Sequence, residues 1–398
     1  MEANNPVDKK SPHRKSMKKT FNLFLIYLFF PIISACCVDG TSTSNMQPES
    51  SVMERRAYVT IITTESEVEP AMAMLASLRA FTRTKYTMDL HEKNEIKTDY
   101  LCLILPQEVI KMYDDLKQLD IGLSYRSVLR LEWAGCEVKL LSYPMWNEWN
   151  EQDDENDKIN WSSIDFNRLW IWSLMDYEKL VYIHHDMLIL QDVTNLFDLE
   201  IWTDITSFAA APSIPPDVFD TSIMVIKPDM SVFQEMVHFV KTGGRGSGDF
   251  DLKPTDDVDV ILNQVFFKDW YTMSHNHRLR PIYNAPYDWT FNEKVWLKHR
   301  SDIKVFHFDD PKPWEIIADP SQNKVSKYGA PLIYVWSLLM FFITQPLVNL
   351  EEETRYVFTE VFDITKDSKD VSAYIARMKR GGTRRRTSLQ DGNRHHEL

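Results

Sequence analysis

One apolar run of strand length, Leu180–Ile183, leads directly into His184-His185-Asp186, and a second short apolar run, Met187–Leu190, follows at once. In a parallel sheet, ligands bind at the carboxyl ends of the strands, where side chains leave the packed layer. His184 and Asp186 are therefore two potential metal ligands at a position that suits chemistry.

Upstream of this segment, runs typical of strands alternate with runs typical of helices. Tyr58–Thr63 is rich in β-branched residues, and Pro70–Phe81 follows with apolar residues at helical spacing. The other expected elements are strands at Tyr100–Leu105 and Glu137–Leu141 and helices near Gln107–Leu119 and at Phe166–Tyr177. This alternation predicts an α/β fold with a mostly parallel, Rossmann-like sheet and right-handed crossovers.

The N-terminus carries a targeting signal. Six basic residues precede an apolar stretch from Phe21 to about Cys37, which is close to the minimum length for a membrane-spanning helix. We expect a cytoplasmic basic tail at 1–20 and a signal anchor at 21–38, because basic residues before a span stay in the cytoplasm. A cleaved signal peptide and a lipidation box at Ile33–Cys36 are the alternatives, and all three direct the rest of the chain out of the cytosol.

The remaining chain divides by composition. Residues 39–55 are polar and predict a stem. The main folded domain is expected at 56–365, and 366–398 form a polar, basic tail that we expect to be disordered. Within the domain, the segment Tyr328–Leu347 contains the apolar run Leu332–Ile343, which Pro331 and Pro346 bracket. The length of this run favours a buried core helix over a second membrane span.

Charge and cysteine content limit the remaining possibilities. The net charge of -13 disfavours a nucleic-acid partner, because phosphate binding needs a basic face. Cys102 and Cys136 lie in strand-like runs. They could pair in an oxidising compartment, but we expect two buried free thiols.

Four separate segments follow one family pattern: a first strand at Tyr58–Thr64, a central block at Phe166–Phe197, a segment at Asp256–Trp270 and a closing motif at His307–Trp314. Together they resemble glycosyltransferase family 8, the glycogenin-like enzymes. The resemblance implies a GT-A fold, a nucleotide-sugar donor that is usually UDP-linked, and transfer with retention of configuration. Together with the N-terminal signal, we expect a Golgi or endoplasmic reticulum membrane protein, single-pass type II with a lumenal catalytic domain, or a secreted protein after signal cleavage.

The resemblance assigns roles to individual residues. A diphosphate leaving group develops negative charge, so its site needs a divalent cation and a fixed basic group. The expected metal ligands are His184, Asp186 and His307. The expected donor-binding residues are Thr60, Thr63, Thr64, Arg168, His185 and Lys312, and the expected catalytic residues are Asp220, Asp259 and Arg168.

The sequence also departs from the family pattern. His184 replaces the first Asp of the family's Asp-x-Asp motif, which shifts the expected metal from Mg²⁺ towards Mn²⁺ or Zn²⁺, and we expect Mn²⁺. The sugar-contact motifs are altered to Asp220-Thr221-Ser222 and Val258-Asp259-Val260, and an acidic pair, Asp309-Asp310, lies near the expected phosphates.

Three functions remain open. The first is a glycosyltransferase that moves a hexose to a glycan, glycolipid or protein acceptor. The second is a pseudo-glycosyltransferase that keeps the fold for binding or for stabilising a partner, which the altered motifs suggest. The third is an iron-dependent oxygenase, because His184, Asp186 and His307 also have the form of a two-His-one-carboxylate site, although such enzymes use antiparallel β architecture.

Overall fold

The computed structural model of the chain describes residues 55–86, 98–107, 122–141, 164–201, 208–213, 218–242, 257–318, 325–343, 354 and 357. The predicted cytoplasmic tail, signal anchor and C-terminal tail lie outside these residues. So do nearly all of the predicted stem and the helix expected near Gln107–Leu119.

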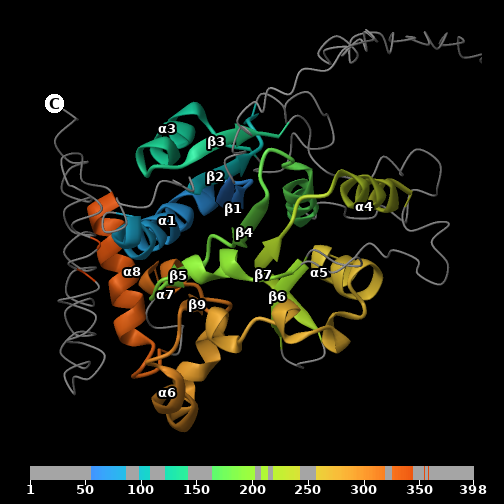
Figure 1. The fold of residues 1–398 in the computed structure, drawn as a ribbon. Coiled ribbons are helices and arrows are strands. Elements are labelled where there is room, and N and C mark those ends of the chain that lie inside the picture. Colours follow the sequence, from blue (N-terminus) through green and yellow to red (C-terminus); the bar gives the residue numbers. More distant parts are fainter. Residues whose placement is uncertain are drawn as a thin grey trace, which may run out of the picture. The chain divides into compact units, whose positions relative to one another are not determined.

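A six-stranded sheet forms the centre of the described fold (Figure 1), with the order β3-β2-β1-β4-β7-β6. The strands are β1 (Arg56–Ile62), β2 (Thr98–Ile104), β3 (Glu137–Leu140), β4 (Lys179–Ile183), β6 (Phe208–Pro212) and β7 (Phe219–Ile226). β1 to β4 are mutually parallel, whereas β7 is antiparallel to both β4 and β6. The predicted α/β class is confirmed, with a mixed but mostly parallel sheet.

Each face of the sheet is covered by apolar residues from different helices. On one face lie α1 (Glu65–Tyr86) and α8 (Ala330–Ile343). On the other lie α4 (Met230–Thr242), α5 (Val258–Ile261) and a 3₁₀ helix, η3 (Ile164–Ser173). The described chain further contains α3 (Tyr125–Trp133), α6 (Glu293–His299) and α7 (Pro313–Ala318). Side chains alternate across the strands, so a strand such as β1 contributes to both cores.

The helix predicted at Phe166–Tyr177 was wrong in type and in length. η3 is a 3₁₀ helix in which Phe166, Leu169 and Trp172 are all fully buried. A spacing of three residues places side chains in line along a 3₁₀ helix, because that helix has three residues per turn. The buried pattern therefore follows the tighter helix, and Arg168 lies between its buried positions.

The cysteine prediction was also wrong. Cys102 in β2 forms a disulfide with Cys136, and their Cα atoms are 5.9 Å apart. Cys102 pairs across the sheet with Val138 of β3, so Cys136 lies just ahead of the neighbouring strand. The sequence did not show that β2 and β3 would be adjacent.

The apolar run forms a core helix over Ala330–Ile343, as predicted. Leu332, Ile333 and Val335 of α8 are buried in the same core as α1. Among the helices of the described residues, none has both the length and the apolar character needed to cross a bilayer.

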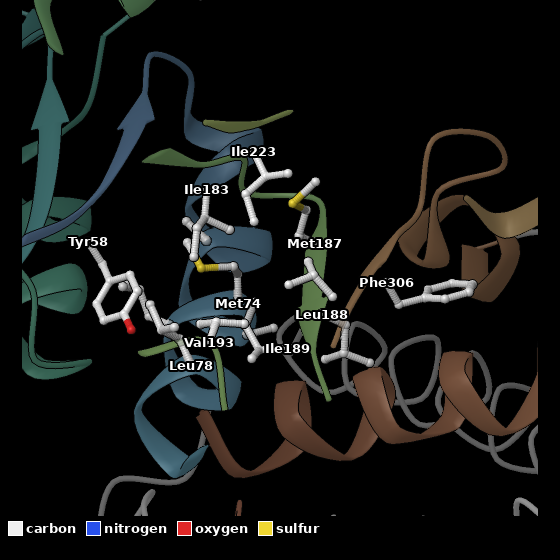
Figure 2. Close-up of a cluster of buried hydrophobic side chains, with 14 of the residues drawn as sticks. Tyr58, Met74, Leu78, Ile183, Met187, Leu188, Ile189, Val193, Ile223 and Phe306 are labelled. Carbon is white, nitrogen blue, oxygen red and sulfur yellow. The ribbon is translucent and has the colours of Figure 1, made fainter. Parts of the chain in front are cut away.

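A second, three-stranded sheet holds the segment that follows Asp186. It contains β5 (Met187–Ile189), β9 (Val305–His307) and β8 (Ala285–Pro286) in the order β5-β9-β8. Figure 2 shows Met187, Leu188 and Ile189 packed within the apolar cluster beside α1. The three residues His184–Asp186 are thus anchored by a buried strand on each side.

Candidate functional site

The backbone around His184-His185-Asp186 connects three strands. The His184 amide donates to the Ser222 carbonyl of β7 at 2.8 Å, and the Phe308 amide donates to the Asp186 carbonyl at 3.2 Å. Met187 of β5 is paired with His307 of β9. This pairing brings His307 beside Asp186, although 121 positions separate them in the chain.

Asp186 is the centre of what we call the Asp186 cluster, which comprises Asp186, His184, His307 and Lys312. Only 2% of the Asp186 side chain is exposed. Its Oδ1 lies 2.5 Å from His184 Nδ1, and its Oδ2 accepts a hydrogen bond from Lys312 Nζ at 2.5 Å. His307 Nε2 lies 3.4 Å from the same Oδ2. The structure therefore brings the three predicted metal ligands together, along with the predicted phosphate lysine.

These neighbours control protonation in the cluster. Burial by itself would raise the pKa of Asp186, but the adjacent His184 and His307 hold that pKa well below its ordinary value. Burial would lower the pKa of His307, yet the charges of Asp186 and Asp220 raise it. Asp186 is thus a carboxylate that its surroundings keep ionised.

His185 differs from both of its neighbours. Burial, followed by the proximity of His184, lowers its pKa well below the ordinary value, and its ring lies 4.1 Å from that of His184. Its Nδ1 is buried with no hydrogen-bond partner in the described part of the chain. His185 is therefore a neutral imidazole, and its predicted contact with the donor stays a prediction.

Lys312 is held at the start of α7. Its Nζ also donates to the Phe308 carbonyl at 2.7 Å, and its backbone amide donates to Glu315 at 3.3 Å. A quarter of its side chain, 26%, remains exposed. In the adjacent acidic pair, Asp309 is exposed and accepts the Tyr287 amide at 3.1 Å. This bond ties the closing segment to the end of β8.

A second group, which we call the Asp259 cluster, comprises Asp259, Arg168 and Thr221. Arg168 of η3 donates to the Thr221 hydroxyl, the Thr221 hydroxyl donates to Asp259, and Arg168 Nη1 lies 3.3 Å from Asp259 Oδ1. The cap of α5 is Asp257, whose Oδ1 accepts the Val260 amide at 3.0 Å. Asp259 is therefore not the capping residue of this helix.

Desolvation by the surrounding protein raises the pKa of Asp259, against the opposing effects of Arg168 and Thr221. However, 45% of the Asp259 side chain is exposed. Water screens an exposed group, so we expect its protonation to shift less than burial alone would suggest.

Asp220 lies between the two clusters. Its Oδ1 accepts the Ser222 amide at 2.7 Å, and its Oδ2 lies 3.9 Å from His307 Nδ1. Burial would raise its pKa, but His307 and Ser222 lower it. Asp220 contacts His307 of the Asp186 cluster, and the next residue on β7, Thr221, belongs to the Asp259 cluster. Strand β7 therefore joins the two clusters into one continuous site.

The three predicted threonines lie in β1 or between β1 and the start of α1. Thr60 is 1% exposed and its hydroxyl is buried without a partner among the described residues. The hydroxyl of Thr63 donates to Glu67, which also accepts the amides of Thr63 and Thr64 at the start of α1. Their side chains thus serve the sheet and the helix start, and a role in reading the nucleoside stays a prediction.

The expected divalent cation does not fit the Asp186 cluster as it is arranged. Two ligands at right angles on one metal, with bonds of about 2.1 Å, lie about 3 Å apart, whereas His184 Nδ1 and Asp186 Oδ1 are 2.5 Å apart. The other carboxylate oxygen of Asp186, Oδ2, already accepts a hydrogen bond from Lys312 Nζ. Across the described residues, no group of three or more His, Cys, Asp or Glu side chains is arranged to hold a metal ion.

One residue beside the site was not predicted. Asn284 follows a short 3₁₀ helix at Pro281–Tyr283, is buried, and hydrogen-bonds to Asp220. Its only signal in the sequence is a polar residue between apolar Tyr283 and Ala285. Such an isolated asparagine is common in turns, so the pattern did not single it out.

Comparison with known proteins gives several relatives and no matching family model. Human Glycogenin-1 is 30% identical over 164 residues, which are 40% of this chain and 42% of that protein. Glycogenin-1 of Caenorhabditis elegans is 23% identical over 265 residues, covering 65% and 50%. An Arabidopsis thaliana protein named "Putative UDP-glucuronate:xylan alpha-glucuronosyltransferase 4" is 24% identical over 207 residues, covering 51% and 31%. The chain thus spans half or less of the length of these relatives.

Solved structures with a similar arrangement also include glycosyltransferases. The glycosyltransferase GlyE of Streptococcus pneumoniae is 16% identical, with 78% of this chain and 64% of that chain covered and a TM-score of 0.42. The galactosyltransferase LgtC, solved with donor and acceptor sugar analogues, is 13% identical, with 75% and 99% covered and a TM-score of 0.42. At these TM-scores the structural likeness adds nothing to the functional conclusion.

Proposed function

We propose that this chain, a divergent relative of the glycogenin-like glycosyltransferases, transfers a hexose from a nucleotide-diphosphate sugar to a glycan, lipid or protein acceptor. The family resemblance makes a UDP-linked donor the expected one. The observation that carries the proposal is the meeting of Asp186, His307 and Lys312 beyond the end of β4. Two of these residues come from a segment far along the chain, and the strand end is the place where ligands of such sheets bind.

The two clusters suit the two parts of a sugar donor. Lys312 offers a positive charge to the diphosphate, because an ammonium group binds phosphate as a point charge. Asp259 keeps nearly half of its side chain exposed and can accept hydrogen bonds from sugar hydroxyls. Arg168 contacts Thr221 and Asp259, which positions that carboxylate.

In the proposed reaction, the bond between the anomeric carbon and the terminal phosphate oxygen breaks. The acceptor hydroxyl oxygen forms a new bond to that carbon on the same face, which retains the configuration. The hydroxyl proton passes to the departing diphosphate. The contribution expected of the protein is stabilisation of the charge on the leaving group and orientation of the sugar.

A pseudo-glycosyltransferase is the second candidate. It is favoured by the internal contacts of the site, since both oxygens of Asp186 and one oxygen of Asp259 already bind protein groups. Such a protein would bind a nucleotide or a partner protein without transferring sugar.

The deciding experiment uses the full-length protein in detergent. Calorimetry with UDP measures donor-site binding, and a hydrolysis screen of UDP- and GDP-sugars with Mn²⁺, Mg²⁺ or chelator measures turnover. Binding with hydrolysis supports the transferase. Binding without hydrolysis or transfer supports the pseudo-enzyme, and a silent titration in all conditions contradicts the proposal.

The proposed setting is the lumen of the Golgi or endoplasmic reticulum, with residues 21–38 as a type II anchor. The support is the basic and then apolar N-terminal sequence. Resistance to carbonate extraction, with protease protection of the catalytic domain in intact microsomes, is the expected result. Release of the protein into the medium would favour a cleaved signal instead.

A further inference from the structure

We propose that the ammonium group of Lys312 takes, on Asp186, the place of a divalent cation, so that donor binding and transfer proceed without a metal. This inference rests on the proposed function, since it concerns how the same site binds a nucleotide diphosphate. It departs from the sequence-based expectation of Mn²⁺ and from glycosyltransferases of this kind, which typically use a divalent metal.

The position of Lys312 is the first support. Its Nζ is 2.5 Å from Asp186 Oδ2 and 2.7 Å from the Phe308 carbonyl oxygen. An ammonium group has three donors, so two are committed to the protein and one is left for a phosphate oxygen. A partly exposed side chain, fixed by two contacts, is a preorganised cation beside the space a donor would enter.

The nitrogen of His184 is the second support. His184 Nδ1 lies 2.5 Å from Asp186 Oδ1, so the two atoms share a hydrogen bond and are closer together than two ligands at right angles on one metal, which lie about 3 Å apart. A cation that bound Asp186 through both residues would have to separate them and would also have to displace Lys312. Because both oxygens of Asp186 already bind protein groups, the arrangement favours the Lys312 ammonium group over a bound metal ion.

Charge balance is the third support. A motif with two aspartates brings two negative charges, which a divalent cation matches. Here His184 stands at the first position, so the pair brings the single negative charge of Asp186. The single positive charge of Lys312 matches it. The loss of one carboxylate at position 184 therefore agrees in charge with an ammonium group, that of Lys312, in the place of a divalent metal.

The first test compares the full-length protein after metal removal with the same protein given Mn²⁺ or Mg²⁺. UDP affinity by calorimetry and UDP-sugar hydrolysis are expected to be unchanged by the chelator. Binding or hydrolysis that occurs only with a metal would overturn this inference while leaving the proposed function intact. Failure in every condition would instead contradict the proposed function.

The second test measures metal binding directly by electron paramagnetic resonance of Mn²⁺. The wild-type protein is expected to show no stoichiometric Mn²⁺ binding, with or without UDP. The variant His184→Asp with Lys312→Met, which restores the second carboxylate and removes the internal cation, is expected to bind one Mn²⁺. Stoichiometric binding by the wild type would overturn the inference, whatever the fate of the variant.

The third test changes Lys312 alone. In chelator, Lys312→Met is expected to lower UDP affinity by about tenfold to a hundredfold, since a charge-assisted hydrogen bond contributes about 1.5–3 kcal/mol. Lys312→Arg should recover part of the loss. The matched control is Lys327→Met, because Lys327 pairs with Glu293 on the surface. Unchanged affinity in a folded Lys312→Met protein would contradict the inference.

Discussion

Asp186 and Asp259 are both carboxylates that lie beside a cationic side chain, yet their surroundings shift their pKa values in opposite directions. Asp186 is nearly inaccessible and has nitrogen atoms at 2.5 Å on both oxygens, and its pKa is well below the ordinary value. Asp259 has one arginine at 3.3 Å and a hydroxyl, and its pKa is raised.

The difference shows that burial does not decide the charge of a carboxylate by itself. Desolvation favours the neutral acid at both positions, and only several close donors overcome it. The Asp186 cluster is therefore organised around a fixed negative charge. The Asp259 cluster keeps a carboxylate that is partly exposed and less strongly stabilised, which suits contact with neutral hydroxyl groups.

The largest expected effect comes from Asp186→Asn. Removal of one partner of a buried ion pair leaves the other charge uncompensated, so we expect a loss of about 3–5 kcal/mol in the free energy of unfolding. Urea denaturation measures this loss. Asp310→Asn, at an exposed neighbouring position, is the matched control and should be neutral. A loss below 1 kcal/mol would place Asp186 with ordinary surface ion pairs.

The next effect concerns Arg168→Met. Without Arg168, Asp259 loses its nearest cation, and we expect kcat to fall about a hundredfold, or about 2.7 kcal/mol in barrier height, in a folded protein. Arg168→Lys should recover part of this loss. Steady-state kinetics with a UDP-sugar provide the measurement. The control is Arg278→Met, which changes an exposed arginine that lies over the Tyr271 ring. An effect on KM alone would indicate donor binding without positioning of the sugar.

A smaller effect is expected for Thr221→Val. This change keeps the shape of the side chain and removes the hydroxyl between Arg168 and Asp259, which should cost about 1 kcal/mol of stability. The pKa of Asp259 should rise further, because the hydroxyl lowers it. Titration followed by carboxyl NMR signals would show the rise, and an unchanged pKa would mean that the hydroxyl has no part in the cluster.

The smallest effect is a difference in pH dependence. A lowered pKa means that Asp186 contributes stability above its ordinary value of 3.8, and that this contribution is lost as pH falls towards the folded pKa. The raised pKa of Asp259 gives a stability contribution of the opposite sign. Ionised Asp259 destabilises the folded protein above its folded pKa, and this destabilisation is relieved as pH falls towards 3.8.

Denaturation from about pH 2 to 6 should therefore separate the two residues. The stability difference between wild type and Asp186→Asn should shrink on acidification below 3.8. For Asp259→Asn, the free energy of unfolding of the wild type should rise relative to that of the variant as pH falls from the raised pKa of Asp259 towards 3.8. Equal slopes for the two variants would remove the contrast between the clusters.

Several features of the fold could be predicted because they depend on local pattern. The strand at Leu180–Ile183, the helix containing Met74 and Leu78, and the core helix before Pro346 all have apolar spacing that matches the element formed. The same reasoning failed at Phe166–Ser173, where apolar residues three apart formed a 3₁₀ helix. Spacings of three and of three to four are hard to distinguish over so short a segment.

His184 and Asp186 were identified from their chemical types and their place at a strand end, whereas His307 and Lys312 were identified from the family resemblance. His184, Asp186, His307 and Lys312 were predicted together, and the structure brings them together. Their individual roles could not be derived in the same way. Whether Asp186 binds a metal or an ammonium group depends on distances of a few tenths of an ångström.

By itself, the sequence determined the parallel strands β1 to β4, the helices α1 and α8, and where reactive side chains leave the sheet, because these follow from hydrophobic period and residue type. Tertiary structure alone decided the neighbours: Cys136 beside Cys102, Thr221 between Arg168 and Asp259, and Lys312 on Asp186. The physical reason is that hydrogen bonds and ion pairs act over about 3 Å, and only the folded chain brings residues so distant in sequence within that range.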